Sequence, residues 1–236
     1  MLKKRIEKLY WSWIQWKYGP ERLLAKHSRG LKDAVVLQIG SNDGLTGDPL
    51  HRLIRKNSSW RAVFVEPIDK LFTRLKRNYG NDPRFTFINA AVASKCGQIE
   101  LHYIDTEQLT RQGEQWPAWL DQIATTNVTS LRECEGGRYK SLIRSTSVEC
   151  VDGAKLVEIS RINRVDILHI DAEGQDFAIL QTVFAAGVRP KIVLIEHVCL
   201  GPETAKKMHQ FLTATHRVRN IGNDFFCLAK RPETAR

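Results

Sequence analysis

Two segments of the chain place polar residues directly after apolar runs, where ligands are commonly bound. Glu66 follows the run 61–65, and residues 35–39 lead into Gly40-Ser41-Asn42-Asp43-Gly44. Glycines let a ligand approach the backbone, and one carboxylate can accept hydrogen bonds from both hydroxyls of a ribose. The turn lacks the G-x-G-x-x-G order of dinucleotide sites, which argues against a pyrophosphate ligand. The two segments therefore predict a nucleoside site, with S-adenosylmethionine as the expected ligand.

Acids and a histidine follow two later apolar runs and provide groups that can move a proton. Asp171 and Glu173 come after one run, and Glu196 and His197 come after the next. Because an imidazole titrates near neutral pH, His197 is the first candidate for a general base, with Asp171 and Glu173 as alternatives. A divalent metal bound by Asp171, Glu196 and His197 is a further alternative, since such an ion would acidify a hydroxyl.

The polar segments follow elements that predict an α/β fold. Short runs rich in β-branched and aromatic residues predict buried strands at 35–39, 61–65, 85–88, 165–170 and 191–195. Helical patterns lie between them at 69–79, 153–159, 175–184 and 202–212, and Asp48-Pro49 is expected to open another helix. Strands alternating with helices form a mostly parallel sheet, whose carboxyl ends meet at one rim. Asn89 and Ala90 join this rim, where small residues leave room for an adenine ring.

The remaining strands and one long segment complete the domain. Residues 216–221 and 224–229 are expected to form a closing antiparallel pair, and 97–103 an added strand. Residues 105–146 show no clear period. Long irregular segments in compact domains are often lids or binding loops, so we expect an insertion or lid here.

Residues 1–32 are expected to form a basic, aromatic-rich helical arm ahead of a domain at 33–236. A helix in this arm would place Ile6, Trp13 and Trp16 on one side, among many Lys and Arg side chains. Such a helix fits a peripheral contact with the inner face of a membrane. Packing on the edge of the domain, or on a second copy in a homo-oligomer, is the alternative.

The composition sets limits on compartment and partners. The chain has 236 residues, with 36 Lys and Arg against 26 Asp and Glu and a net charge of +10, which favours an acidic partner surface. Its 5 cysteines are scattered and form no C-x-x-C pair, which argues against a zinc site or a disulfide framework. No apolar run approaches the ~20 residues of a membrane span, and no signal peptide is recognisable. A cytoplasmic protein is therefore expected.

Four segments together resemble a known family. The sequence contains VVLQIGSNDG, then FVEP, then INAAVAS, then VDILHIDAEGQDFAIL, and this order is similar to the FkbM family of S-adenosylmethionine-dependent methyltransferases over about residues 34–230. The resemblance implies a class I methyltransferase fold, a Rossmann-like, seven-stranded, mostly parallel α/β sheet with helices on both faces. It also implies methyl transfer to hydroxyl oxygens of sugars, polyketides and related metabolites.

The resemblance also implies roles for individual residues. The segment Gly40–Gly44 would surround the methionine end and the ribose of the cofactor, and Glu66 would bind the ribose hydroxyls. Asn89 and Ala90 would lie near the adenine. Asp171 would lie near the cofactor amino group or the point of methyl transfer. The arm and the insertion match nothing in the family pattern, so they are expected to select the substrate.

The predicted function is O-methylation of a sugar, glycan or glycolipid-like acceptor. An RNA methyltransferase is one alternative, suggested by charge alone. The absence of an Asn-Pro-Pro motif argues against nucleic acid, as does the concentration of basic residues near the N-terminus. A non-catalytic binding domain that retains the fold is the other alternative.

Overall fold

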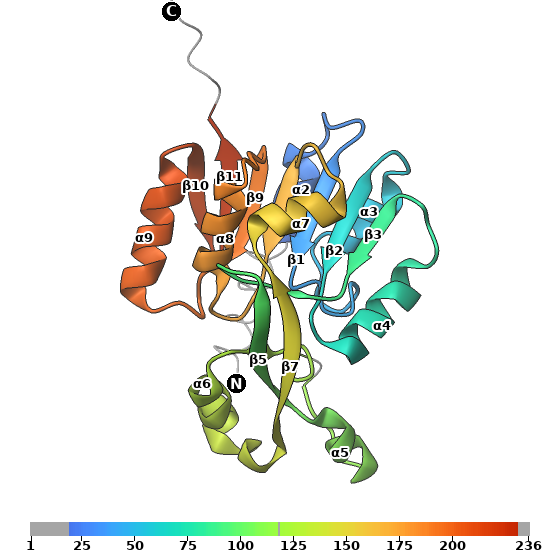
Figure 1. The fold of residues 1–236 in the computed structure, drawn as a ribbon, viewed down its shortest axis with the longest axis vertical. Helices are drawn as coiled ribbons and strands as arrows, with labels where there is room; N and C mark the ends of the chain where they lie inside the picture. The colour runs from blue at the N-terminus through green and yellow to red at the C-terminus, as the bar shows by residue number, and fades with distance from the viewer. Residues whose placement is uncertain (1–18, 118, 231–236) are drawn as a thin grey trace, which may run out of the picture.

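The structure is a computed structural model and describes residues 19–117 and 119–230. Its centre is a seven-stranded sheet, shown in Figure 1. The spatial order is β10 (His216–Ile221), β11 (Asp224–Ala229), β9 (Ile192–Glu196), β8 (Ile167–Ile170), β1 (Val35–Ile39), β2 (Arg61–Val65) and β3 (Phe85–Ile88). The predicted seven-stranded, mostly parallel sheet is confirmed.

Only one strand of this sheet runs against the others. The pairs from β3 through β9 are parallel, and β11 is antiparallel to both β9 and β10. From β1 the chain proceeds outward to β2 and β3, then returns to β8 on the other side of β1. The strand order therefore reverses beside β1, and ligands bind at such a reversal, beyond the carboxyl ends of the strands.

In the described part of the chain, three helices cover each face of the sheet. One face carries α2 (Pro20–His27), α3 (His51–Lys56) and α4 (Asp69–Tyr79), and the other carries α7 (Gly153–Ser160), α8 (Asp176–Ala185) and α9 (Pro202–Thr213). Each face has its own apolar core, because the sheet strands are buried on both sides. Val36 points into the first core and Leu37 into the second, as the alternation of a strand requires.

A second, smaller sheet extends from the carboxyl rim of the main sheet. Its order is β4 (Ala91–Val92), β7 (Ile143–Val151), β5 (Gly97–Ile104) and β6 (Ala124–Thr125). In Figure 1 the long strands β5 and β7 run downward from the main sheet. The strand predicted at 97–103 thus belongs to a separate sheet, where it pairs with β7 along its whole length. Strand β7 begins within the segment expected to be an insertion.

The described part of that segment has a core of its own. It contains α5 (Thr106–Arg111), α6 (Val128–Glu133) and two short 3-10 helices, η1 (Cys134–Gly137) and η2 (Lys140–Leu142). Leu109, Leu120, Leu131 and Tyr139 are buried together between these elements. An ion pair of 2.5 Å between Arg74 of α4 and the buried Asp121 ties the segment to the main domain.

The helix that was expected to open at Asp48-Pro49 begins later in the structure. Asp48 does not cap it, since α3 begins at His51, with Leu50 at the N-cap position. Instead, the Asp48 carboxylate accepts the backbone N–H of Leu50 at 2.8 Å. An Asp followed by Pro favours a local turn of this kind as well as a helix start, which is why the predicted start was wrong by two residues.

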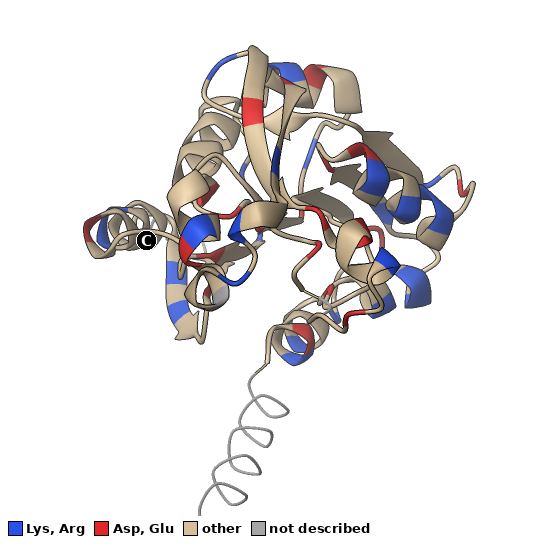
Figure 2. Cartoon of the chain, turned by 90° about the horizontal axis from the view of Figure 1, so that it is seen from below, with Lys and Arg blue, Asp and Glu red and all other residues tan. Residues whose placement is uncertain are grey.

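The N-terminal region is described from residue 19 onward. Leu23 and Leu24 of α2 are buried in the core beneath the main sheet, so this part of the predicted arm packs on the domain. The tryptophan-bearing part at 1–18 lies outside the described residues. No helix in the described part of the chain is long and apolar enough to cross a membrane. Lys and Arg positions are spread over several outer helices (Figure 2).

Candidate active site

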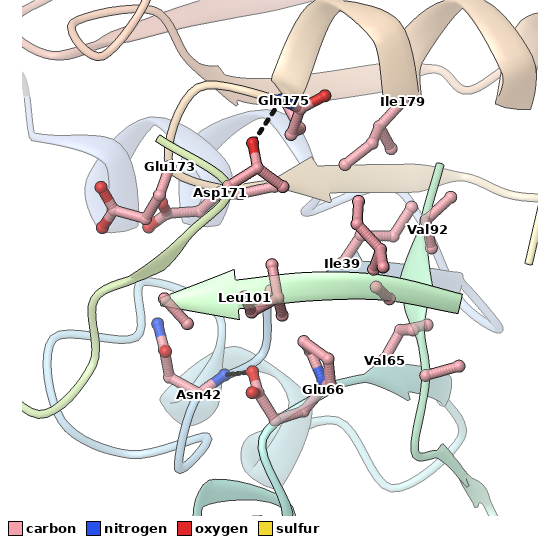
Figure 3. A pocket seen from close by; sticks show the side chains of 18 of the residues that line it. Ile39, Asn42, Val65, Glu66, Val92, Leu101, Asp171, Glu173, Gln175 and Ile179 are labelled. Atoms are coloured by element: carbon pink, nitrogen blue, oxygen red, sulfur yellow. Dashed lines mark hydrogen bonds between the residues drawn. The ribbon is translucent and has the colours of Figure 1, made fainter. Parts of the chain in front are cut away.

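The carboxyl ends of β1, β2 and β8 surround a narrow cavity, hereafter the first cavity. Figure 3 shows its lining, with Asn42 and Glu66 on one side and Asp171 and Glu173 on another. The apolar part of its wall includes Ile39, Val65, Ala90, Ala91, Val92, Ile99 and Leu101. The rim predicted from the strand ends therefore does bring these three polar segments together.

Glu66 is buried at the end of β2 and holds two backbone groups. Its Oε2 accepts the N–H of Asn42 at 2.9 Å, and its Oε1 accepts the N–H of Ile68 at 2.9 Å. Burial raises the pKa of Glu66 to about 7, and the two N–H groups only partly oppose that shift. Because a carboxylate oxygen has two lone pairs, each oxygen keeps one for a ligand hydroxyl.

The glycines of the β1 loop are required by the protein itself. Gly40 has φ +76°, and a Cβ there would overlap the carbonyl oxygen of Asp171. Gly44 has φ +66°, and a Cβ there would overlap Leu75 and Tyr79 of α4. Close approach of a ligand was the expected reason for these glycines. The structure shows close approach of β8 and α4 instead, although the Gly40 backbone also lines the first cavity.

Ser41 and Asp43 are committed to the loop rather than to the first cavity. The buried Ser41 hydroxyl donates to the carbonyl of Gln38 at 3.0 Å and accepts the N–H of Val65 at 3.2 Å, which joins β1 to β2. Asp43 accepts the N–H groups of the two residues that follow Gly44, at 2.9 and 2.8 Å. Both residues therefore shape the loop, and neither lines the cavity.

The two residues predicted near the adenine separate in the structure. Ala90 is buried and lines the first cavity. Asn89 donates from Nδ2 to the carbonyl of Glu66 at 3.0 Å and lines a different groove beside Lys70 and Tyr103. Asn89 therefore fixes the chain after β2, and an adenine in the first cavity would meet Ala90 and its apolar neighbours.

Asp171 and Glu173 stand at the other end of the first cavity. Burial, reinforced by Glu196 and Glu173, raises the pKa of Asp171 well above its usual range. Burial also raises the pKa of Glu173, whose Oε2 accepts a hydrogen bond from the Cys199 thiol at 3.3 Å. Glu173 has a left-handed backbone with φ +49°. Once ionised, a carboxylate with a raised pKa is a stronger base than an ordinary one.

Asp176 holds the loop that carries these acids, and the sequence analysis did not identify it. Its carboxylate is fully buried and accepts the N–H of Ala172 and the N–H of Gly174, both at 3.0 Å. Burial raises its pKa to about 6. The available signal was an acid three residues after Glu173, at the start of a helix, where Asp commonly binds nearby backbone N–H groups.

Glu196 and His197 lie beside the first cavity rather than in its wall. Burial, followed by the charges of Glu173 and Asp176, raises the pKa of Glu196 to about 8. The His197 ring stacks on Phe225 with centroids 4.2 Å apart.

The metal set predicted from sequence is not assembled among the described residues. The groups within 4.8 Å of one another there are Glu173, Glu196 and Cys199. His197 and Asp171 are not in this group. The His197 ring packs on Phe225 instead of joining these groups. The spacing of residues along the strand does not determine the direction of this side chain.

A segment of the insertion closes the first cavity. Gln122, Ala124 and Thr126 line it, and Thr125 donates from Oγ1 to the carbonyl of Glu173 at 2.9 Å. Gln122 donates to the carbonyl of Thr46 at 3.2 Å, which ties the segment to the β1 loop as well. The cavity measures about 60 Å³. Cavities that hold small ligands measure ~300–1,000 Å³, so the first cavity, with segment 122–126 in this position, is too small for a nucleoside.

The strand order, the reversed β11 and the acid after β2 define a class I S-adenosylmethionine-dependent methyltransferase. Within that class, the chain belongs to the family of the methyltransferase FkbM domain, whose family model matches residues 38–222. Comparison with curated proteins finds no match. The resemblance identified from the sequence is confirmed, and the protein is a methyltransferase that uses S-adenosylmethionine.

Solved structures of methyltransferases are similar to this chain at low identity. The O-methyltransferase from Bacillus cereus, in complex with S-adenosylhomocysteine (SAH), is 13% identical, with 89% of this chain and 80% of that chain covered and a TM-score of 0.44. A chain of the fibrillarin/Nop5p complex is 13% identical, with 91% and 83% covered and a TM-score of 0.47. Human methyltransferase-like protein 13, also with SAH, is 12% identical, with 85% and 72% covered and a TM-score of 0.40.

Proposed function

We propose that this enzyme transfers the methyl group of S-adenosylmethionine to a hydroxyl oxygen of a sugar, glycan or glycolipid-like acceptor. The observation that carries the proposal is the pair of carboxyl groups, Asp171 and Glu173, at one end of the first cavity. A hydroxyl must lose its proton as it attacks the methyl carbon. A buried carboxyl whose pKa is raised is, once ionised, a stronger base toward that proton than an exposed carboxylate.

The donor set of the first cavity fits S-adenosylmethionine. Glu66 has one free acceptor position on each oxygen for the ribose hydroxyls. Ala90, Val92 and Leu101 offer an apolar surface for the adenine. The carboxyl of Asp171 complements the positively charged end of the molecule. When bound, S-adenosylmethionine supplies an already activated methyl group, so the protein mainly contributes alignment, worth up to ~7–11 kcal/mol in favourable cases.

The position of the acids favours Asp171 and Glu173 as the base. Both line the first cavity, while the ring of His197 packs on Phe225 beside it. A general base typically contributes ~10²–10⁴-fold to the rate. We therefore place proton transfer on a carboxyl rather than on an imidazole.

Calorimetric titration of S-adenosylmethionine tests the cofactor site. We expect micromolar binding, equivalent to ~8 kcal/mol, and a loss of about 100-fold in Glu66→Ala, since two hydrogen bonds to a charged group are removed. Glu100→Ala is the matched control, because Glu100 is exposed on β5. Absence of binding by a folded wild-type protein would contradict the proposal.

The acceptor is tested with labelled S-adenosylmethionine and neutral methyl glycosides. Label is expected in an alkali-stable methyl ether. Transfer that occurs only to amine, carboxylate or RNA acceptors would refute the hydroxyl assignment while leaving the cofactor site intact.

A further inference from the structure

A second cavity of about 410 Å³ adjoins the first one. It lies between α6 and the loop that joins β8 to α8, and its polar lining comprises Thr126, Asn127, Ser130, Glu173, Gln175 and Cys199. Thr126, Glu173 and Gln175 also line the first cavity, so the two cavities share a wall. Its volume falls within the ~300–1,000 Å³ of cavities that hold small ligands.

The lining of the second cavity selects a chemical class of ligand. Its side chains are mostly neutral hydrogen-bonding groups, and none of the described residues that line it is Lys or Arg. Glu173 is its one carboxylate. A phosphate or carboxylate on the ligand would therefore meet no positive side chain and one negative one, while a neutral polyol would find donors and acceptors.

Glu173 is positioned from several directions at the shared wall. Asp176 holds the N–H groups on either side of it, and Thr125 binds its carbonyl oxygen at 2.9 Å. The Cys199 thiol donates a hydrogen bond to Oε2 of Glu173 and not to Oε1. Burial and the neighbouring charges of Glu173 and Glu196 raise the pKa of Cys199, so its sulfur stays protonated and remains a donor. In Figure 3 the Glu173 carboxylate points away from the apolar end of the first cavity.

Gln175 sets the boundary between the two cavities. Its Nε2 donates to Oγ1 of Thr126 at 2.8 Å, which links α8 to the insertion across the shared wall. Asn127 and Ser130 lie on the far side of that link. The Oδ1 of Asn127 accepts the N–H of Thr129 as the cap of α6, so its Nδ2 group is left to donate to a ligand.

We propose that the second cavity binds the acceptor as a neutral, polyhydroxylated ring, and that Glu173 is the catalytic base that receives the proton of the reacting hydroxyl. This inference rests on the proposed function. In the step, the acceptor oxygen forms a bond to the methyl carbon while the bond from that carbon to sulfur breaks. The electron pair of the broken bond stays on sulfur, and the hydroxyl proton moves to the Glu173 carboxylate, which later releases it to water.

Two variants of α6 test the location of the acceptor. With a methyl glycoside that wild type methylates, Ser130→Ala and Asn127→Asp are each expected to raise the KM for the glycoside about three- to tenfold, the effect of one lost hydrogen bond. Asn127→Asp keeps the oxygen that caps α6, so the helix is retained. Thr129→Ala is the control, since Thr129 is exposed on the same helix and does not line the second cavity. The Kd for S-adenosylmethionine should not change in any of the three.

Glu173→Gln tests the catalytic role. We expect kcat to fall ~10²–10⁴-fold, with the Kd for S-adenosylmethionine changed less than threefold. At saturating S-adenosylmethionine, wild type is expected to show a rise of kcat/KM for the glycoside with pH as Glu173 ionises, and this rise should be absent from the residual activity of Glu173→Gln. Glu173→Asp should restore part of the rate and the pH dependence. This would distinguish a proton acceptor from a residue that only shapes the loop.

The outcomes separate this inference from the function on which it rests. If wild type does not bind S-adenosylmethionine, the proposed function fails. If it binds and methylates a neutral glycoside while both α6 variants keep the wild-type KM, or if sugar phosphates are methylated better than neutral glycosides, the acceptor assignment is overturned and the proposed function stands. An unchanged pH profile in Glu173→Gln would overturn the catalytic role of Glu173.

Discussion

Ionisation of Glu66 should make the folded protein less stable as the pH rises. The folded pKa of about 7 lies above the ordinary value of 4.5, because the carboxyl is buried. The folded state therefore binds a proton that the unfolded state has already lost. This contribution to stability is complete below pH 4.5 and is lost as the pH rises through 7.

The size of the effect follows from the two pKa values. Ionising Glu66 at high pH costs the folded state about 3 kcal/mol relative to the unfolded chain. Part of this cost is already present at pH 5, where the unfolded carboxyl is mostly ionised. Between pH 5 and pH 8.5 the free energy of unfolding should therefore fall by about 2–3 kcal/mol through Glu66 alone. For a chain of this length, that equals about 5–10 °C in Tm.

Glu66→Gln provides the comparison. The amide cannot ionise, and its NH₂ group must face the N–H of either Asn42 or Ile68, which costs about 1–3 kcal/mol at every pH. Because this penalty is the same at every pH, it lowers the free energy of unfolding of the variant by a constant amount. It adds no pH dependence of its own. Other buried carboxyls, such as Glu196 with a pKa of about 8, titrate in both proteins and cancel in the difference.

Urea unfolding of both proteins from pH 5 to pH 8.5 measures this difference. The free energy of unfolding of wild type minus that of Glu66→Gln should decrease by about 2–3 kcal/mol from pH 5 to pH 8.5. The m values of the two proteins should be equal. Curves that stay parallel within about 0.5 kcal/mol would show that Glu66 is ionised in the folded protein at every pH tested. The argument from burial would then be refuted.

Three further predictions concern the cofactor site. The Kd of wild type for S-adenosylmethionine should fall about tenfold from pH 6 to pH 8, while that of Glu66→Gln should not show this fall. The reason is that the ionised Glu66 carboxylate accepts both ribose hydroxyls, and calorimetry at each pH checks this. Gly40→Ala should cost more than about 3 kcal/mol in urea unfolding, since the new Cβ overlaps the Asp171 carbonyl, while Gly47→Ala, at φ +72° in open space, should cost only about 1–2 kcal/mol. Hydrogen exchange at 122–126 should slow when S-adenosylmethionine binds, and equal rates with and without it would contradict the role of this segment as a closing wall.

The strand ends were predictable because they depend on simple rules. A buried apolar run followed by Gly, Asp or Glu marks the end of a parallel strand, and parallel strands end at one rim. Five polar strand ends were expected to converge. Three of them, at Gly40, Glu66 and Asp171, do surround the first cavity. Asn89 and His197 turn elsewhere, to the backbone of Glu66 and to Phe225.

The strand ends that line the first cavity differ from Asn89 and His197 for a physical reason. Alternation fixes the direction of a side chain only while the strand continues. Asn89 and His197 come just after their strands, where the direction depends on contacts with distant parts of the chain. Asp176 was missed for the same reason. It binds backbone N–H groups of a loop in which Glu173 is left-handed, and no local sequence pattern predicts that conformation.

The second sheet was not predictable for another reason. Strand β7 spans Ile143–Val151, but exposure alternates along only part of it, since 144 and 145 are both exposed and 150 and 151 are both buried. Its pairing partner, β5, lies some 40 residues earlier, and the intervening segment has no period. The shape of both cavities depends on this segment, through Thr126 and its neighbours. The cofactor side of the site was therefore more accessible to sequence reasoning than the acceptor side.

The buried acids of the protein fall into two kinds, and the contrast supports a functional role for one of them. Asp166, at the amino end of β8, is buried and paired with Lys191 at 2.8 Å and Arg164 at 3.2 Å. A buried charge that serves the fold is normally compensated in this way. At the carboxyl end of the sheet, Glu66 and Asp171 owe their raised pKa values first to burial, and the charges that shift Asp171 further are other carboxylates. Among the described residues, Glu66 and Asp171 thus form no ion pair with a basic side chain, at the rim where a positively charged methyl donor and a hydroxyl proton would have to be received. Such an arrangement costs stability, and it is typical of sites where the compensating charge arrives with the ligand.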